Sequence, residues 1–430
     1  MILRQIEDKD LAQYSYLVGC QKTKEAIIID PQRDIEKYFE LAKKEGVNIV
    51  AAVDTHIHAD YITGLREFAE KQIKVYASNE GGSDWQYEWL KNSNYNYELI
   101  GDAAQIKIGN ITLKAVHTPG HTPEHLTFLL IDHPRSDKPL AAFTGDFIFV
   151  GDVGRPDLLE SAAKVEGAME IGAKQLFNSI QKFKEQSKDL MILPGHGSGS
   201  ACGKSLGAVP FSTFGYELDN SEALSFNDEK DFVEFILKDQ PAPPMYFARM
   251  KKENKEGPDL YEDKKPELLD KPRGKLINVG DRTCNTGILV DTNTLAEIAG
   301  SYIQKEDQIT LLTKKENLQK NINTLMKIGL DNVVGYLEEY KEEQKNNEDK
   351  EHFYLDVRGE KEYNEENLGT KLIPHTRLPD HVQTLDKSKK IMVFCASGGR
   401  AESAASYLRS QGFDAENIGG IEDAKKMFKA

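Results

Sequence analysis

The sequence predicts an α/β protein with more than one domain. Short apolar strands alternate with helical patterns through the opening third of the chain. Several strands end just before a histidine or an aspartate, as Val47 to Val53 does before His56. A smaller strand and helix pattern begins at Gly274 and is repeated once. Loops at strand ends bring distant residues together, which is how layered α/β folds such as αββα sandwiches build sites.

The expected elements of the first part are bounded by turn residues. The strand at 111–116 leads to His121, and the strand at 140–144 leads to Gly145 and Asp146. The other expected strands lie at 15–19, 26–30 and 47–53, and the expected helices at 35–45 and 65–70.

Proline and charge divide the rest of the chain. Prolines cluster at 241–244, and the stretch from Lys251 to Pro272 is charged and poor in apolar residues. A second charged block, 338–351, indicates another connection. We therefore predict domains at 1–240, 273–345 and 350–430, with a linker at 241–272.

The last two predicted domains resemble each other. Strands at 275–279 and 308–313 precede a helix at 316–327 capped by Gly329. The same order returns later in the chain, with strands at 353–357 and 390–394, a helix at 401–409 and a cap at Gly412. This repetition indicates a divergent internal duplication.

Composition excludes several classes of function. The chain has 55 basic and 70 acidic residues, a formal net charge of −15, which disfavours nucleic acid and anionic membranes as partners. No apolar run reaches the length of a membrane span, and the first ten residues lack a signal-peptide core. Four separate cysteines form no CxxC pair, which fits a reducing compartment. We expect a cytoplasmic protein that forms a homo-oligomer.

Histidines and aspartates at strand ends form a candidate metal site. In an extended segment His56 and His58 point to the same side, so they can present two imidazoles to one ion, and Asp60 continues the series. His121, Asp146 and His196 follow in the motifs GH, GD and GHG. His117, His125 and His133 are interpreted as structural.

This motif order resembles the metallo-β-lactamase superfamily over roughly the first 240 residues. The departure is Tyr61, where the dinuclear zinc hydrolases of the superfamily carry a histidine. A phenol remains protonated near neutral pH and is a poor ligand, so a mononuclear centre is expected. Two imidazoles and one carboxylate with open positions suit Fe(II) and O₂.

Within the superfamily the chain resembles persulfide dioxygenases best. This resemblance implies one Fe(II) per chain, held by His56, His121 and Asp146. By spacing alone His58 would also be a ligand. The resemblance instead places four residues around the metal without binding it: His58, Asp60, Tyr61 and His196.

Two more residues are expected near this pocket. Arg155, in the stretch GDVGRPD, either contacts an anionic substrate thiol or organises its loop by pairing with Asp157. Cys202 follows His196 by six residues and either accepts a sulfane sulfur in transit or is a small buried thiol.

A loop near the end of the chain is built to hold a thiolate. Cys395 ends an apolar strand and faces the start of a helix, where backbone N–H groups and the positive helix end stabilise a thiolate or persulfide. Gly398 and Gly399 let the loop curl. Together with Ser397 they are expected to bind the substrate. Arg400 either braces the loop or holds an anionic acceptor such as sulfite. With Leu355 to Arg358 upstream, this domain resembles rhodanese sulfurtransferases, and Cys395 and Arg400 take the catalytic roles.

The middle domain resembles a degenerate rhodanese without an active cysteine. Its strand at 309–313 leads into Lys314 and Lys315, with no cysteine and no glycine pair. Cys284 lies outside any such loop and is expected to be structural. The role of Cys20 is left open.

The full order resembles bacterial fusions of a persulfide dioxygenase with a sulfurtransferase. It implies oxidation of a low-molecular-weight thiol persulfide by O₂ to sulfite, followed by transfer of a second sulfane sulfur to sulfite, giving thiosulfate, in sulfide detoxification. Two alternatives are a zinc thioester hydrolase like glyoxalase II with an appended sulfurtransferase, and a non-enzymatic persulfide relay or sensor. Whether glutathione, coenzyme A or bacillithiol carries the persulfide is left open.

Overall fold

The computed structural model describes residues 1–161, 167–280, 286–341 and 350–429. These residues form two compact units. Unit 1 comprises 1–240 and 247–261, and unit 2 comprises 241–246 and 262–430. The Cys284 prediction lies outside the described residues.

Unit 1 is built on two six-stranded sheets. The first sheet runs in the order β1-β2-β3-β4-β5-β6 and the second in the order β12-β11-β10-β9-β8-β7. The strands are β1 (Ile2–Asp8), β2 (Gln13–Gly19), β3 (Glu25–Ile29), β4 (Asn48–Val53), β5 (Lys74–Ser78), β6 (Tyr97–Ile100), β7 (Gln105–Ile108), β8 (Ile111–His117), β9 (Leu126–Asp132), β10 (Ala141–Gly145), β11 (Met191–Pro194) and β12 (Ser212–Thr213).

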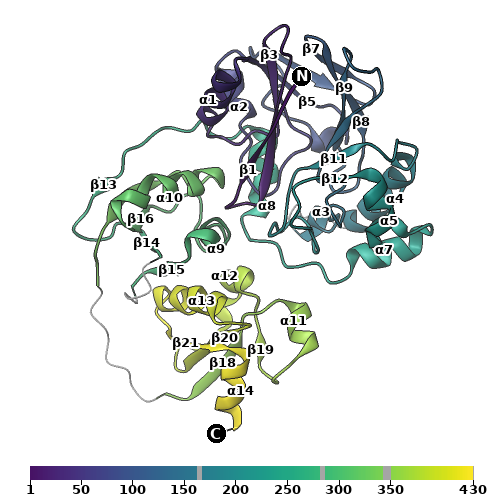
Figure 1. Ribbon diagram of the computed structural model, residues 1–430. Helices are drawn as coiled ribbons and strands as arrows, with labels where there is room; N and C mark the ends of the chain where they lie inside the picture. Colours follow the sequence, from purple (N-terminus) through teal and green to yellow (C-terminus); the bar gives the residue numbers. More distant parts are fainter. Residues whose placement is uncertain (162–166, 281–285, 342–349, 430) are drawn as a thin grey trace. The chain divides into compact units, whose positions relative to one another are not determined.

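Helices cover the outer face of each sheet (Figure 1). In β3, Ile27 and Ile29 pack between the sheets, whereas Ala26 and Ile28 pack outward against α1 and α2. In the second sheet Ile192 packs outward with residues of α4 and α7. The helices are α1 (Glu36–Glu45), α2 (Leu65–Glu70), α3 (Leu158–Ser161), α4 (Ala168–Phe183), α5 (Phe214–Asn220), α6 (Glu222–Ser225), α7 (Glu229–Leu237) and α8 (Phe247–Glu256). Unit 1 is therefore the predicted αββα sandwich.

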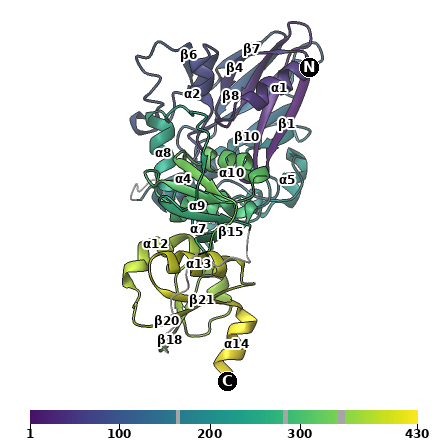
Figure 2. The same ribbon diagram turned by 90° about the vertical axis from the view of Figure 1, so that its left-hand side faces the viewer.

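Part of the segment expected to be a linker belongs to unit 1. Helix α8 lies within 241–272, and residues 247–261 cluster with the sandwich. Phe247 and Met250 are buried despite the many charges around them. The prediction of a linker was therefore wrong for this stretch, because Phe247, Met250 and Asn254 form one buried face of α8. Figures 1 and 2 both show α8 below α2.

Unit 2 contains two parallel sheets with the same strand order. The order β17-β16-β14-β15 in the first matches β21-β20-β18-β19 in the second, and β13 is added at the edge of the first. This shared topology fits the predicted duplication. The strands are β13 (Glu267–Leu268), β14 (Lys275–Val279), β15 (Ile288–Val290), β16 (Ile309–Leu312), β17 (Val333–Leu337), β18 (His352–Asp356), β19 (Lys371–Leu372), β20 (Lys390–Cys395) and β21 (Asp414–Gly420).

Helices lie in the connections that follow β15, β16, β18, β19 and β20, as is usual between parallel strands. Gly329 and Gly412 have φ of 70° and 83° just after their helices, which confirms the predicted caps. The helices are α9 (Leu295–Tyr302), α10 (Lys315–Lys327), α11 (Glu360–Glu365), α12 (Leu378–His381), α13 (Gly399–Ser410) and α14 (Ile421–Lys429).

Candidate metal centre and sulfurtransferase loop

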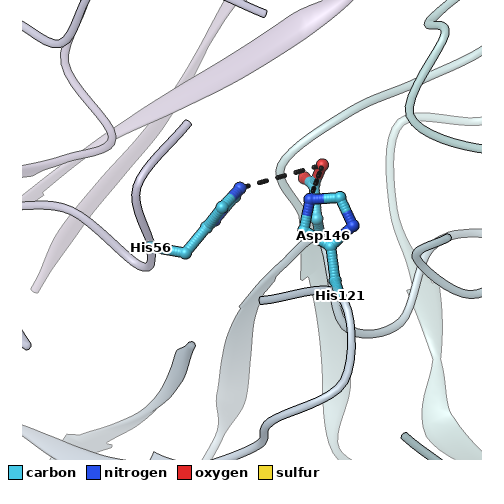
Figure 3. Close-up of side chains that lie close together, drawn as sticks. All are labelled: His56, His121 and Asp146. Atoms are coloured by element: carbon cyan, nitrogen blue, oxygen red, sulfur yellow. Dashed lines mark ion pairs between the residues drawn. The ribbon is translucent and has the colours of Figure 1, made fainter. Parts of the chain in front are cut away.

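Three strand ends of unit 1 bring the predicted metal ligands together. His56 follows β4, His121 follows β8 and Asp146 follows β10. One donor atom from each lies within 4.8 Å of the others, and all three side chains are buried. His56 Nε2 lies 4.0 Å and His121 Nε2 3.5 Å from Asp146 Oδ2 (Figure 3). The three side chains converge from both sheets of the sandwich.

Close packing at Gly145 makes this convergence possible. Gly145 has φ of 47°, and a Cβ there would lie 2.5 Å from Thr55 Oγ1. Only glycine allows the end of β10 to approach the loop that carries His56. The glycine of the GD motif therefore brings Asp146 up to the histidines.

Hydrogen bonds leave one donor atom of each ligand available for a metal. His121 Nδ1 donates to the carbonyl of Arg155 at 3.0 Å. Thr55 Oγ1 donates to Asp30 and so accepts from His56 Nδ1 at 2.9 Å. Both histidines therefore keep the Nε2 lone pair. Among the described residues, His56 Nε2 and Asp146 Oδ2 have no hydrogen-bond partner. Buried, unpartnered donors of this kind fit a metal ion.

His196 links the other oxygen of Asp146 to Asp60. Its Nδ1 lies 2.8 Å from Asp146 Oδ1 and its Nε2 2.8 Å from Asp60 Oδ2. Burial lowers the pKa of His196, but the two carboxylates outweigh burial and raise it well above its ordinary value. The pKa of Asp146 is correspondingly held well below its usual range, despite burial, chiefly by His196. An imidazolium at His196 thus keeps Asp146 ionised.

The pKa values of the two predicted histidine ligands favour their neutral form. Burial, then the neighbouring His58, lowers the pKa of His56 well below its ordinary value. Burial is also the largest cause of the lowered pKa of His121. Neutral imidazoles are the form that binds metals.

His58 and Tyr61 hydrogen-bond to Asp30 and not to the three-donor cluster. His58 Nε2 lies 3.2 Å from Asp30 Oδ1, and Asp30 raises the His58 pKa to about 9 against the effect of burial. The Tyr61 hydroxyl accepts from Gln13 Nε2 at 3.3 Å and donates to the Asp30 carbonyl at 3.4 Å. Burial raises the Tyr61 pKa well above 10. A protonated phenol bound in this way is no metal donor.

Arg155 is bonded to Asp157 in its own loop and to the loop that carries Cys202. It pairs with both carboxylate oxygens of Asp157, at 2.8 and 2.6 Å, and donates to the carbonyl of Ala201 at 3.0 Å. It is buried, with an exposed fraction of 1%. This geometry fits the loop-organising alternative, and a contact with substrate remains a prediction.

Cys202 lies beside the metal centre. Its Sγ is within 4.8 Å of donor atoms of Asp60 and His196. Burial, then Asp146, raises its pKa well above the ordinary value. The structure therefore places Cys202 where a role in the pocket was expected, as a buried thiol.

The predicted sulfur-carrying loop joins β20 to α13 in unit 2. Cys395 ends β20 and is buried, and the N–H of Gly398 donates to its Sγ at 3.1 Å. Gly398 has φ of 97°, which turns the chain into α13 at Gly399. Ala396, Ser397 and Gly399 are exposed. The Cys395 sulfur is therefore buried beneath exposed loop residues and lies next to the N-terminus of α13.

Arg400 braces this loop. Its two terminal nitrogens bind the two carboxylate oxygens of Glu362 at 2.7 and 2.6 Å. Glu362 also accepts from the N–H of Gly359 at the start of α11. The pair holds the pKa of Glu362 below its usual value. In the middle domain, β16 leads through Thr313 and Lys314 into α10, and no cysteine occupies the equivalent position.

Both candidate sites lie in stretches of the chain that match known protein families. The model of the metallo-β-lactamase superfamily matches residues 8–196, and the model of the rhodanese-like domain matches residues 336–426. The chain is 34% identical over 202 residues to the mitochondrial persulfide dioxygenase ETHE1 of Bos taurus, which covers 46% of this chain and 68% of that protein. The human enzyme is 30% identical over 201 residues, with the same coverage.

The chain belongs to the metallo-β-lactamase superfamily. A solved structure described as a metallo-β-lactamase from Staphylococcus aureus subsp. aureus COL is 42% identical, with a TM-score of 0.74, and covers 78% of this chain and 99% of that one. The bovine and human relatives of this chain are persulfide dioxygenases. In this chain the metallo-β-lactamase domain is joined to a rhodanese-like domain. No described helix is both long and apolar enough to span a bilayer.

Three buried residues support this metallo-β-lactamase centre without having been expected to do so. His125, interpreted as structural, accepts at Nε2 from the N–H of Asp146 at 3.1 Å, and burial lowers its pKa to about 3. Glu124 accepts from the N–H of Ile57 at 2.7 Å. Asn254 of α8 reaches the same loop from the other side. Glu124 and Asn254 carry no sequence signal, because lone polar residues look like surface positions.

Proposed function

We propose that this chain is a non-haem Fe(II) persulfide dioxygenase coupled to a thiosulfate-forming sulfurtransferase. The observation that carries the proposal is the three-donor cluster of His56, His121 and Asp146, in one chain with the Cys395 loop. The proposed partners are a low-molecular-weight thiol persulfide, O₂ and sulfite. Sulfide detoxification in the cytoplasm, by a homo-oligomer, completes the proposal.

One Fe(II) per chain is the proposed cofactor. The donor set of two neutral imidazoles and one carboxylate is the facial arrangement typical of Fe(II) oxygenases. Iron held there supplies the redox chemistry that O₂ needs. The residues around it orient the donors: His196 keeps Asp146 ionised, and Thr55 and the Arg155 carbonyl fix the two imidazole rings.

The proposed oxidation balances with water as the third reactant: RSSH + O₂ + H₂O → RSH + SO₃²⁻ + 2H⁺. The S–S bond breaks, the sulfane sulfur is oxidised and O₂ is reduced. Buried surroundings exclude bulk water from the reacting atoms, which protects a reactive persulfide. His58, Asp60, Tyr61 and His196 shape the pocket, and Cys202 is proposed to accept a sulfane sulfur in transit.

Sulfur transfer is proposed to run through Cys395. Its thiolate attacks the sulfane sulfur of a second persulfide, so that RSH leaves and a cysteine persulfide forms. Sulfite then attacks the outer sulfur, giving thiosulfate and regenerating the thiolate. The Gly398 N–H and the N-terminus of α13 stabilise negative charge on sulfur at this position. Ser397, Gly398 and Gly399 form the proposed cradle for the acceptor, with Arg400 beside it.

A zinc thioester hydrolase is the competing function, and Tyr61 argues against it. Dinuclear centres need a donor where the Tyr61 hydroxyl is instead bound to Gln13 and Asp30. His196 already has both nitrogens bonded to carboxylates. A second metal therefore lacks a donor at position 61.

Anaerobic metal analysis with an O₂-uptake assay tests the proposal. We expect about one iron per chain and O₂ consumption with glutathione, coenzyme A or bacillithiol persulfide. His121→Ala and Asp146→Ala should lose the iron. His117→Ala is a matched control, because His117 donates to the Pro123 carbonyl and faces no donor of the cluster. Two tightly bound zinc ions in the active protein would overturn the proposal.

A further inference from the structure

Helix α8 contributes a buried asparagine to the metal-binding loop of unit 1. Asn254 lies 190 or more residues along the chain from this loop and is fully buried, with an exposed fraction of 0%. The helix is otherwise rich in charge, including Lys251, Lys252 and Lys255. A buried amide on such a helix needs partners to offset its desolvation.

Every polar atom of the Asn254 side chain is used within one loop. Its Nδ2 donates to the carbonyls of His58 and Tyr61, both at 2.8 Å. Its Oδ1 accepts from the N–H of Thr63 at 3.0 Å. One side chain therefore joins three backbone groups of the segment that begins at the ligand His56.

Two carboxylates hold the start of the same loop. Glu124 accepts from the N–H of Ile57, and Asp30 accepts from the N–H of Thr55 at 2.6 Å. Asn254 holds this loop from a part of the chain that lies outside the first 240 residues. Removing it leaves two buried carbonyls and one N–H without this partner.

Helix α8 is itself anchored against unit 1. Arg66 of α2 donates to the carbonyls of Gly257 and Pro258, just after the helix. The N–H of Glu88 donates to the carbonyl of Lys255 at 2.8 Å. The Arg66 side chain and the Glu88 N–H thus hold the end of the helix that carries Asn254.

We propose that Asn254 is a positioning residue for the metal centre, and that α8 acts as a clamp on the loop from His56 to Thr63. Asn254 touches no metal donor atom. It acts through the backbone, by keeping the His56 ring turned towards His121 and Asp146. This inference rests on the proposed iron site.

Fe(II) affinity of the full-length apoprotein, measured anaerobically, tests the clamp. Because partners behind metal ligands are typically worth about 10- to 100-fold in affinity, Asn254→Ala should weaken Fe(II) binding by about tenfold or more. Asn254→Asp keeps the acceptor for Thr63 but has no donor for the two carbonyls, so it should weaken binding as well. The visible spectrum of Co(II) bound to either variant should differ from that of the wild type.

Two matched variants serve as controls. Asn321→Ala removes a fully buried asparagine on α10 of unit 2, which donates to Thr313 at 2.9 Å. Lys252→Ala removes a side chain of α8 that is 73% exposed. Neither should change Fe(II) affinity or the Co(II) spectrum.

The outcomes separate this inference from the proposed function. If the wild type binds no iron, or His121→Ala keeps it, the proposed function fails. If His121→Ala loses iron while Asn254→Ala and Asn254→Asp bind as the wild type does, only the clamp is overturned. A lower melting temperature with unchanged affinity and spectrum would also overturn it. Should Asn254→Ala not fold, Asn254→Ser, which keeps one donor, carries the same test.

Discussion

Single hydrogen bonds decide which atom of each donor residue is left for a metal. The His121 ring is fixed by the Arg155 carbonyl and the His56 ring by Thr55, so that both expose Nε2. His196 occupies one oxygen of Asp146 and leaves the other. The same logic explains why Tyr61 does not complete a second site, because its hydroxyl is bound elsewhere.

Replacing Tyr61 with histidine tests this reading of the second site. Tyr61→His should increase occupancy by a second metal, because the added imidazole would let Asp60 and His196 exchange their mutual hydrogen bond for metal coordination. Metal content per chain after dialysis measures the effect. Tyr61→Phe removes the hydroxyl without adding a donor and should leave the metal content unchanged. Equal metal content in Tyr61→His and wild type would mean that something other than residue 61 disables the second site.

Glu124 is a buried carboxylic acid whose ionisation opposes folding. Burial raises its pKa from 4.5 to about 7. The unfolded chain therefore releases its proton first, and stability is lost as pH rises from the unfolded pKa through the folded one. In Glu124→Gln the amide oxygen can still accept from Ile57, but nothing titrates.

Urea unfolding of the metal-free protein at about pH 5 and about pH 8 measures this effect. Relative to wild type, Glu124→Gln should gain stability between the two pH values, by up to about 3 kcal/mol for the cited shift. Glu170→Gln is a suitable control, since Glu170 is an exposed residue of α4. An equal difference between Glu124→Gln and wild type at both pH values would contradict the prediction.

At the scale of elements, periodicity was a good guide and isolated polar residues were not. Alternating apolar residues predicted β2 to β4 and their junction with the His56 loop, and Gly412 marked the end of α13. The HxH, GH and GD motifs predicted the cluster because each lies at a strand end. Helix α8 was missed because charged side chains dominate it and the buried face is short.

The sequence also could not predict which charged side chains pair with each other in the loops. From the sequence, Arg155 could either pair with Asp157 or contact an anionic substrate. Its contacts with Asp157 and Ala201 favour the first role. Likewise the partner of Arg400 is Glu362, which lies 38 residues earlier and belongs to no motif. Long-range pairs of this kind depend on how the elements pack.

At the scale of the molecule, the chain carries two sites that need different chemistry. The three-donor cluster lies wholly in unit 1, and the Cys395 loop lies wholly in unit 2. The chain passes from unit 1 into unit 2 at 241–246, returns at 247–261 and leaves again. Unit 1 is therefore incomplete without residues that follow the first stretch of unit 2.

The two activities should be separable by single substitutions. Oxidation needs the iron donors, whereas sulfur transfer needs a thiolate at Cys395, so Cys395→Ser should leave persulfide-dependent O₂ uptake largely intact. Sulfite should then accumulate in place of thiosulfate, because a serine hydroxyl is far too weakly acidic to act as this nucleophile. His56→Ala should abolish O₂ uptake while transfer of sulfane sulfur to added sulfite survives.

Assays of sulfite and thiosulfate, run beside the O₂-uptake assay, measure both activities. If Cys395→Ser makes thiosulfate at the wild-type rate, the terminal domain is not the transferase, and Cys202 beside the metal centre becomes the leading candidate.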